Sequence, residues 1–262
     1  MSFIKREATN EQKISSQSLT NSISSVKFLI VDVLHLKHKN SRLFDHWPEK
    51  YDQWFTTPIG TLVKEYEGEL ILDLLKPRQG EIILDAGCGT GIFTLGILSL
   101  GAHVVGLDIS LPMLVRAAQK AKAYPFQAIL ADMLSLPFQD SSFDKVVSVT
   151  ALEFIKDAKG AVNELFRVTK KGGLIIVTTL NSLSHWASRR KAQAKKGHAI
   201  FKEAIFRSPD ELQSLGPVDG MIRTAIHFQK DDEPDRVPEI EHEGQRNGLN
   251  TGAFLTARWE KP

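Results

Sequence analysis

Residues 83–91, Ile83-Leu84-Asp85-Ala86-Gly87-Cys88-Gly89-Thr90-Gly91, decide the fold of this chain. The short apolar run that ends at Leu84 leads into a glycine-rich loop, which is typical of a buried strand. A helical pattern follows over residues 92–100, and Gly101 is placed to close it. A glycine-rich turn between a first strand and a helix lets a ligand approach backbone amides, at the strand ends where open α/β sheets bind ligands. The segment therefore predicts a ligand site.

The alternation of strands and helices continues on both sides of this segment. Four further strand-like runs and three further helices are expected: strands over residues 103–107, 126–130, 145–150 and 174–180, and helices over residues 61–75, 110–122 and 157–169. Five strands separated by helices predict βαβ units and a parallel sheet. Residues 221–228 and 253–259 are expected to pair antiparallel at the edge of the sheet, because no helix-length periodic stretch lies between them.

The composition excludes several classes of protein. The chain has 262 residues, a formal net charge of +2 and one cysteine. So small a net charge gives no field that gathers nucleic acid or an anionic membrane over the whole surface. A single cysteine excludes a disulfide framework, and the polar N-terminus is unlike a secretory signal, so a cytoplasmic protein is expected. Residues 86–107 carry no formal charge, but six glycines there favour a loop, a helix and a strand over a membrane span.

Two regions differ in composition. Residues 1–43 are predicted to be an N-terminal extension rich in Ser, Asn, Gln and Lys. Its apolar island at residues 26–36 is interpreted as part of a loosely ordered tail, or as a strand or helix that docks on the domain or on a second subunit. Aromatic residues become frequent from Phe44, so residues 44–262 are expected to form the folded domain.

The glycine loop lacks the dinucleotide-binding fingerprint. The pattern G-x-G-x-x-G needs glycine at position 92 or 94, where the chain has Ile92 and Thr94. Asp85 agrees with this, because a carboxylate beside the loop repels a diphosphate but attracts a ligand with an ammonium group and a positive sulfur. Asp108, at the end of the second strand, lies at about the 20-residue offset expected of an acid that accepts hydrogen bonds from ribose hydroxyls.

The segment Asp85-Ala86-Gly87-Cys88-Gly89-Thr90-Gly91 has the form acid-x-G-x-G-x-G, which resembles the first motif of the class I S-adenosylmethionine-dependent methyltransferases. The resemblance spans about residues 44–180 and looks most like the methyltransferase type 11 group, which includes quinone-biosynthesis enzymes. Three downstream segments also carry it: residues 136–147, 164–168 and 171–173. It implies a Rossmann-like, doubly wound α/β sheet of seven strands in the order 3-2-1-4-5-7-6, with the last strand antiparallel and helices on both faces.

The resemblance also implies S-adenosylmethionine as the cofactor and S-adenosylhomocysteine as its product. In that family the loop contacts the methionine moiety, an acid after the second strand binds the ribose, and residues after the second and third strands surround the adenine. An N-terminal element, here residues 51–55, closes over the cofactor in many relatives. The predicted cofactor-binding residues are Tyr51, Asp85, Gly87, Cys88, Gly89, Asp108, Ile109, Met113, Asp132, Met133 and Thr150. No metal site is predicted.

Ordinary structural roles compete with these assignments. Asp85 suits the cap of a tight turn, Asp108 a helix N-cap, and Asp132 a simple turn. The ring of Tyr51 suits core packing nearly as well as cofactor contact. Cys88 is expected to fill space between two glycines rather than act as a nucleophile.

Methyl transfer from a sulfonium is an in-line displacement in which the protein mainly aligns the groups and excludes water, so no catalytic residue is required. A hydroxyl or acidic carbon would gain from a base, for which Glu153 and His185 are candidates, with a surface acid and an ordinary loop residue as the alternatives. Residues 181–207 are expected to form a substrate lid. Its basic stretch, residues 189–202, is interpreted either as a solvated helix or as a cap that favours an anionic or membrane-associated acceptor.

The expected function is therefore methyl transfer to a small-molecule acceptor that is anionic or hydrophobic, by a monomer or homodimer, with no nucleic-acid partner and no transmembrane segment. The segment Thr150-Ala151-Leu152-Glu153 lacks the proline-aromatic motif with which nucleic-acid methyltransferases flip bases. The main alternative is a non-enzymatic S-adenosylmethionine-binding protein. A nucleic-acid or protein methyltransferase ranks below it, as does an oxidoreductase, which the failed fingerprint disfavours.

Overall fold

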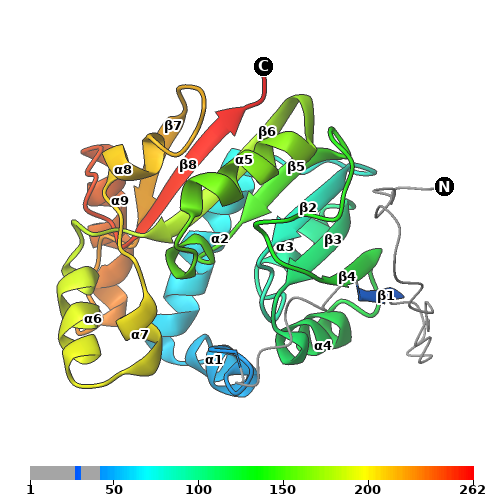
Figure 1. The fold of residues 1–262 in the computed structure, drawn as a ribbon. Helices are drawn as coiled ribbons and strands as arrows, with labels where there is room; N and C mark the ends of the chain where they lie inside the picture. Colours follow the sequence, from blue (N-terminus) through cyan, green and yellow to red (C-terminus); the bar gives the residue numbers. More distant parts are fainter. Residues whose placement is uncertain (1–26, 31–41) are drawn as a thin grey trace.

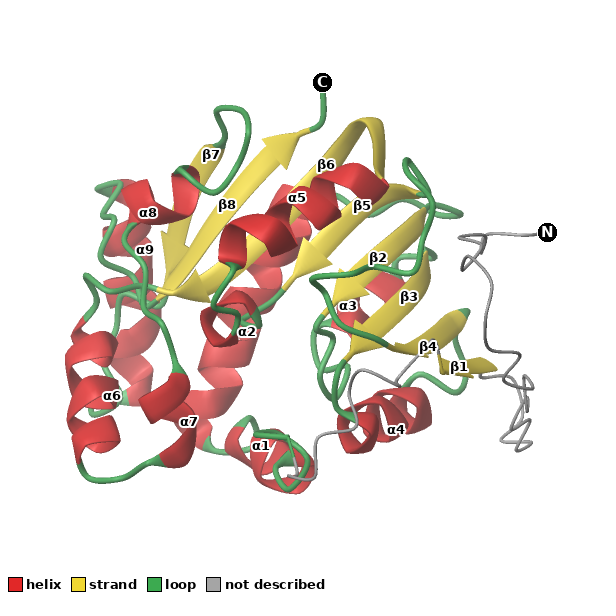
Figure 2. Cartoon of the chain, in the orientation of Figure 1, coloured by secondary structure: helices red, strands yellow, loops and turns green. Residues whose placement is uncertain are grey.

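The computed structural model describes residues 27–30 and 42–262, in which an eight-stranded sheet lies between layers of helices (Figure 1 and Figure 2). The strands lie side by side in the order β1-β4-β3-β2-β5-β6-β8-β7. Their bounds are β1 Lys27–Ile30, β2 Ile82–Ala86, β3 His103–Asp108, β4 Phe126–Leu130, β5 Phe143–Ser148, β6 Thr169–Leu180, β7 Met221–Ala225 and β8 Phe254–Glu260.

The predicted seven-strand order is confirmed when the strands are counted from β2, which gives 3-2-1-4-5-7-6. Strand β2 pairs in parallel with β3 and β5, whereas β8 pairs antiparallel with both β6 and β7. Strand β1 is an addition to this order and pairs in parallel with β4 at the edge of the sheet. It comes from the predicted extension, whose residues 1–26 and 31–41 lie outside the described residues.

Helices connect the strands and cover both faces of the sheet. In Figure 2, α5 lies in front of the sheet and α2 behind it. The α-helices are α1 Pro48–Trp54, α2 Pro58–Leu75, α3 Thr94–Ser99, α4 Leu111–Lys120, α5 Ala158–Val168, α6 His185–Lys195, α7 Ala199–Glu203, α8 Pro209–Gln213 and α9 Val237–Arg246. The described residues also include the 3₁₀ turns η2 Leu152–Phe154 and η3 Pro234–Arg236.

The apolar core is divided by the sheet into two clusters. Adjacent residues of β2 point to opposite faces, so that Ile83 packs with residues of α2, α3 and α4, while Leu84 packs with residues of α5. Both side chains are fully buried. A parallel strand that is covered on both faces is mostly apolar, and the run Ile82-Ile83-Leu84 at the start of β2 predicts a strand for this reason.

Helix α9 corrects the expectation that no helix lies between the last two strands. Its buried residues are Val237, Glu241 and Gly244, so the helix has no apolar stripe at helical spacing. The buried carboxylate of Glu241 is satisfied because it accepts hydrogen bonds from the backbone N–H groups of Ile226 and His227, at 3.1 and 2.7 Å. Helix α9 is thus held by a buried carboxylate, and hydrophobic periodicity in the sequence does not reveal such a contact.

The uncharged stretch at residues 86–107 folds as a loop, helix α3 and strand β3, as predicted. Among residues 27–30 and 42–262, no helix is both long and apolar enough to cross a membrane.

Candidate cofactor-binding site

A cavity of about 820 Å³ lies where β2, β3, β4 and β5 end, on the side of the sheet that the glycine loop occupies. Its size suits a ligand of nucleoside dimensions with a second molecule beside it. The cavity wall contains all eleven residues that the sequence assigned to cofactor binding: Tyr51, Asp85, Gly87, Cys88, Gly89, Asp108, Ile109, Met113, Asp132, Met133 and Thr150. The fold therefore brings them together, and their role toward a ligand stays a prediction.

The glycine loop admits no side chain at its first glycine. Gly87 has φ +80°, and a Cβ at this position would lie 2.5 Å from the Cβ of Ala151. Gly91 does not line the cavity; a Cβ there would meet Ala117 of α4 at 3.1 Å. The first glycine thus keeps the loop close to the cavity, and the last lets the loop pack on α4.

Asp85 supplies an unsatisfied negative group to the cavity wall. Its Oδ2 accepts a hydrogen bond from the Thr94 hydroxyl at 2.6 Å, while its buried Oδ1 has no hydrogen-bond partner in the described part of the chain. Burial raises the pKa of the Asp85 carboxyl to about 7, and Asp108 adds to the rise. A positively charged ligand group would complete this site, because it would pair with the orphaned oxygen and hold the carboxylate ionised.

Asp108 ties the glycine loop to the end of β3. Its Oδ2 accepts from the backbone N–H of Gly89 at 2.9 Å, and its Oδ1 accepts from that of Ser110 at 2.8 Å. Asp132 makes a similar turn, since its Oδ1 accepts from the Leu134 N–H at 2.9 Å. Asp132 thus has the turn role considered for it, whereas Asp108 is not the helix N-cap, since Ser110 occupies that position before α4. Both acids also line the cavity.

Cys88 packs rather than reacts. Its Sγ lies 3.8 Å from the carbonyl oxygen of Gly89, and the side chain contacts the apolar cluster that includes Phe126. Burial, with the nearby carboxylates of Asp85 and Asp108, raises the pKa of the thiol well above its ordinary value. A thiol that stays protonated is a poor nucleophile, which supports the space-filling role.

Residues 42–55, which include α1, form a cover over the cavity. Arg42, Leu43, Phe44 and Tyr51 line it from this side. The cover is tied down by Asp52, which accepts hydrogen bonds from three side chains: Lys120 at 2.6 Å, Thr90 at 2.7 Å and Arg116 at 2.8 Å. Burial alone would raise the pKa of the Asp52 carboxyl, but these donors outweigh it and lower the pKa.

Sequence reasoning identified the aromatic segment of this cover but missed its anchors. Asp45 is a second one, since its carboxylate accepts a hydrogen bond from the Ser110 hydroxyl at 2.7 Å. These partners lie more than 35 residues apart in the chain, so no local spacing reveals them.

The cavity has an apolar end beyond the glycine loop. The rings of Phe44 and Phe154 meet edge to face at 4.8 Å, and Ile155 and Ile205 extend this wall. Charged residues of both signs form the rim: Lys156, Asp157, Lys202 and Glu203. Of these rim residues, sequence reasoning had singled out only Lys202, in the basic stretch of the predicted lid, residues 181–207.

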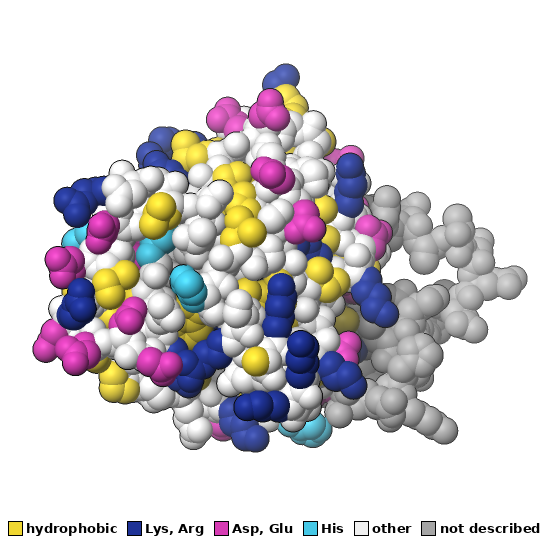
Figure 3. Space-filling model, turned by 90° about the vertical axis from the view of Figure 1, so that its left-hand side faces the viewer, with side chains coloured by type: hydrophobic (Ala, Val, Ile, Leu, Met, Phe, Trp, Pro, Cys, Tyr) yellow, Lys and Arg dark blue, Asp and Glu magenta, His cyan; other side chains and the backbone are white. Residues whose placement is uncertain are grey.

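The two candidate bases lie outside the cavity wall. His185 is exposed at the start of α6. Glu153 is buried in η2, directly behind the wall formed by Thr150, Ala151 and Phe154. Figure 3 faces the α6 side of the molecule, where basic side chains are interspersed with acidic ones. In α6, Arg189 pairs with Asp231 at 2.6 Å, as a solvated basic helix would.

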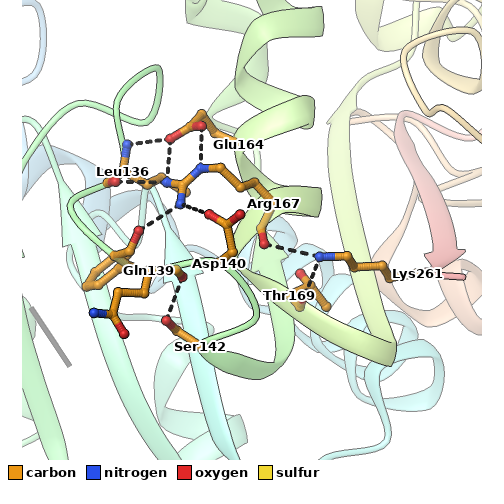
Figure 4. Close-up of polar contacts among 9 residues, drawn as sticks. Leu136, Gln139, Asp140, Ser142, Glu164, Arg167, Thr169 and Lys261 are labelled. Carbon is orange, nitrogen blue, oxygen red and sulfur yellow. Dashed lines mark hydrogen bonds and ion pairs between the residues drawn. The ribbon is translucent and has the colours of Figure 1, made fainter. Parts of the chain in front are cut away.

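The loop that carries Asp132 and Met133 is held by an ion-pair network around Arg167 (Figure 4). The guanidinium donates to both carboxylate oxygens of Glu164, at 2.7 and 2.8 Å, and to Asp140 at 2.8 Å. It also donates to two backbone carbonyls of the loop, those of Leu136 and Phe138. These contacts explain why the loop after β4 keeps its shape.

Comparisons with known proteins agree with this geometry. Residues 84–177 match the protein family described as a methyltransferase domain. The chain is 40% identical over 115 residues to a malonyl-[acyl-carrier protein] O-methyltransferase of Erwinia billingiae, a match that covers 44% of this chain and 45% of that protein. The chain thus spans about half the length of the O-methyltransferases that it matches.

Two further matches extend over most of the chain. An uncharacterised protein of Methanocaldococcus jannaschii is 29% identical over 223 residues, which cover 84% of this chain and 98% of that one. A Thermotoga maritima structure, described as an S-adenosylmethionine-dependent methyltransferase and possible histamine N-methyltransferase, superposes with a TM-score of 0.63 and 26% identity, over 84% of this chain and 98% of that one.

Proposed function

We propose that this chain, which carries a class I S-adenosylmethionine-dependent methyltransferase domain of the type 11 group, transfers a methyl group from S-adenosylmethionine to a small-molecule acceptor. The observation that carries the proposal is the pair of acids on one cavity wall, Asp85 with its orphaned buried oxygen and Asp108 at the end of β3. Together they match a ligand that has an ammonium group and a ribose.

Different residues of the cavity suit different moieties of this cofactor. Asp85 would pair with the ammonium group of the methionine moiety, and Asp108 would accept hydrogen bonds from the ribose hydroxyls. The adenine would lie among the residues after β3 and β4: Ile109, Met113, Asp132 and Met133. The cofactor supplies an electrophilic methyl group. The tethered cover of residues 42–55 would exclude water from the site and hold the acceptor in line.

The acceptor is proposed to bind at the apolar end of the cavity, between Phe44, Phe154 and Ile205. This wall favours a molecule with an apolar body, and the rim lysines Lys156 and Lys202 would suit an anionic group on it. The matched O-methyltransferases act on an acyl group held by a carrier protein, as their name states, which supports an acyl-like acceptor. The product of the cofactor would be S-adenosylhomocysteine.

Calorimetric titration of S-adenosylmethionine tests the proposal directly. Wild-type protein should bind it, and Asp108→Ala should bind about 100-fold more weakly, since hydrogen bonds to a charged group contribute up to ~3 kcal/mol. Asp219→Ala, at an exposed position before β7, is the matched control and should bind like the wild type.

A wild-type protein that does not bind S-adenosylmethionine would refute the proposal, and a normal affinity in Asp108→Ala would refute the ribose assignment. Formation of S-adenosylhomocysteine with a panel of amines, alcohols and carboxylic acids then separates an enzyme from a protein that only binds the cofactor.

A further inference from the structure

A second cavity, of about 360 Å³, lies at the end of the sheet opposite the cofactor cavity, where β2, β5 and β6 begin and β8 ends. In Figure 2 this is the end of the sheet at which the C-terminus lies. We call this cavity the basic pocket. Its wall contains the acids Glu81 and Asp144 and six basic residues: Lys76, Arg78, Lys145, Lys170, Lys171 and Arg258.

Both acids of the basic pocket are already engaged by their neighbours. Glu81 Oε2 accepts hydrogen bonds from the Lys145 ammonium group at 2.8 Å and from the Arg78 backbone N–H at 2.9 Å. Asp144 Oδ1 accepts from the Lys170 ammonium group at 2.6 Å, and its Oδ2 accepts from a backbone N–H of β2 at 2.8 Å. Each acid therefore neutralises one lysine of the pocket.

The other four cations of the basic pocket have no carboxylate partner. Lys76, Arg78, Lys171 and Arg258 form no ion pair within 4 Å among residues 27–30 and 42–262. Six cations against two acids give the pocket more net positive charge than the +2 of the whole chain. A ligand that carries negative charge would relieve the repulsion among these cations.

Arg258 lies in the pocket wall with one donor unused. Side chains alternate along a strand, so Arg258 lies on the same face of β8 as Phe254, which packs in the apolar cluster that contains Leu75 of α2. Helix α2 ends at Leu75, and the pocket lies beyond that end. The Arg258 Nε is buried and has no hydrogen-bond partner in the part of the chain that the structure describes. A guanidinium N–H that loses water without gaining an acceptor is costly, which favours an anion at this wall.

The turn at residues 171–173 leaves one wall of the basic pocket free of side chains. Gly173 admits none, because a Cβ there would lie 2.5 Å from the carbonyl oxygen of Asp144. Gly172 has φ +73°, which favours glycine, and its N–H donates to the Lys261 carbonyl oxygen at 2.8 Å. The turn thus places Lys171 beside bare backbone, which a ligand can approach closely.

The size and the charge of the basic pocket indicate the class of ligand. Its volume is less than half of the 820 Å³ of the cofactor cavity, so it suits a compact molecule rather than an extended polymer. Unpaired lysines and arginines suit a group that carries more than one negative charge on closely spaced oxygens. Phosphate and diphosphate groups have this chemistry, whereas a single carboxylate would leave most of the cations unpaired.

We propose that the basic pocket binds a compact phosphate-bearing ligand, with Arg258 and Lys171 as its principal contacts and Lys76 and Arg78 at the rim. This site is separate from the cofactor cavity and does not depend on the proposed methyl transfer. Because the two cavities lie at opposite ends of the strands, both can be occupied at once.

Calorimetric titration of inorganic pyrophosphate into the full chain tests the proposal. One equivalent should bind with a Kd of about 0.1–1 mM at low ionic strength, and the affinity should fall as salt is added. Saturating S-adenosylmethionine should leave this affinity unchanged. Inorganic phosphate and ribose 5-phosphate are titrated in the same way. Tighter binding of the ester identifies an organic phosphate as the ligand, and tighter binding of inorganic phosphate identifies the free ion.

Matched variants assign the binding to the pocket. Lys171→Gln should weaken pyrophosphate binding about 10-fold, because it removes one charged contact from an exposed turn. Arg258→Met should weaken it about 10-fold or more, and Arg258→Lys, which keeps the charge, should recover part of the affinity. Lys122→Gln makes the same charge change at an exposed position after α4, outside the pocket, and should bind like the wild type. Thermal unfolding shows whether each variant is folded, and the exposed Lys171 gives a test that does not depend on the fold of the Arg258 variants.

A folded wild type that does not bind pyrophosphate at about 10 mM would overturn the proposal. Equal affinity in the wild type and both pocket variants would overturn it too, as would displacement of pyrophosphate by S-adenosylmethionine, since the anion would then lie in the cofactor cavity. Binding of a single-stranded oligonucleotide that the same substitutions abolish, without binding of pyrophosphate, would replace the small ligand with a nucleic acid. If the chain binds pyrophosphate as expected but not S-adenosylmethionine, the proposed function fails and this inference stands.

Discussion

Arg167 and Arg190 each lie among acidic side chains from other parts of the chain. The two arginines differ in whether the guanidinium forms hydrogen bonds with those acids. Every N–H direction of Arg167 is used, by Glu164, Asp140 and two loop carbonyls (Figure 4). Arg190 stacks on aromatic rings instead, and its neighbouring glutamates keep raised pKa values. A satisfied network specifies a shape, whereas the carboxyl groups near Arg190 form no ion pair in the described part of the chain.

The largest effect on stability is expected from breaking the satisfied network. Arg167→Met leaves the carboxylates of Glu164 and Asp140 without their shared cation, so the free energy of unfolding should fall by about 3 kcal/mol. Urea denaturation measures it. Arg189→Met is the control, because its ion pair with Asp231 is solvent-exposed and should contribute under ~1 kcal/mol. Equal losses in the two variants would contradict the structural role of the network.

The buried acid Glu67 should respond in the opposite direction. The folded-state pKa of Glu67, about 8, lies above the ordinary 4.5, so the folded state keeps a proton that the unfolded chain has already lost. Stability from this group is complete below about pH 4.5 and declines as the pH rises through 8. Glu67→Gln should therefore gain about 1–3 kcal/mol at pH 8.5 and almost nothing at pH 4.5.

Denaturant titrations of Glu67→Gln and wild type at the two pH values give this difference. Glu65→Gln, exposed on the same helix, should show no gain at either pH. A loss of stability at pH 8.5 in Glu67→Gln would mean that the carboxylate is a structural anchor rather than an unpaired buried acid.

The buried pair His227 and Glu241 should affect the free energy of unfolding less than Arg167 or Glu67 does. Burial alone would lower the pKa of His227, but the Glu241 carboxylate at 3.2 Å and the Leu249 carbonyl outweigh it and raise the pKa. The stabilisation is complete below pH 6.5 and is lost as the pH rises through the folded-state pKa. His227→Gln should cost about 1 kcal/mol at pH 6 and less at pH 8.5, as measured by urea unfolding at both values.

If His227→Gln costs the same at both pH values, the imidazole acts by packing and not by charge. The comparison with Glu67→Gln then still holds, because that variant changes stability with the opposite sign.

The strands could be predicted from local patterns, whereas their order and most of the cavity wall were implied by the resemblance to the methyltransferases. Buried parallel strands such as β2 are mostly apolar, and the acids and glycines that line the cavity lie at or directly after strand ends. The surroundings of the buried acid Glu67 could not be predicted, since they form only when α2, η2 and α6 pack together. One signal was present: Glu67 interrupts the buried stripe of α2 between Val63 and Ile71, each four residues away.

The extra strand β1 gives the sheet two differently protected edges. Strand β4 would end the sheet with open backbone N–H and C=O groups, and β1 pairs along them from Gln127 to Leu130. At the opposite edge β7 carries the exposed charge of Arg223, which discourages pairing with another chain. A protein that begins at residue 44 would keep the charged edge and lose the paired one. Removing the N-terminal residues would therefore expose the backbone groups of β4 that β1 pairs, and we expect self-association along β4.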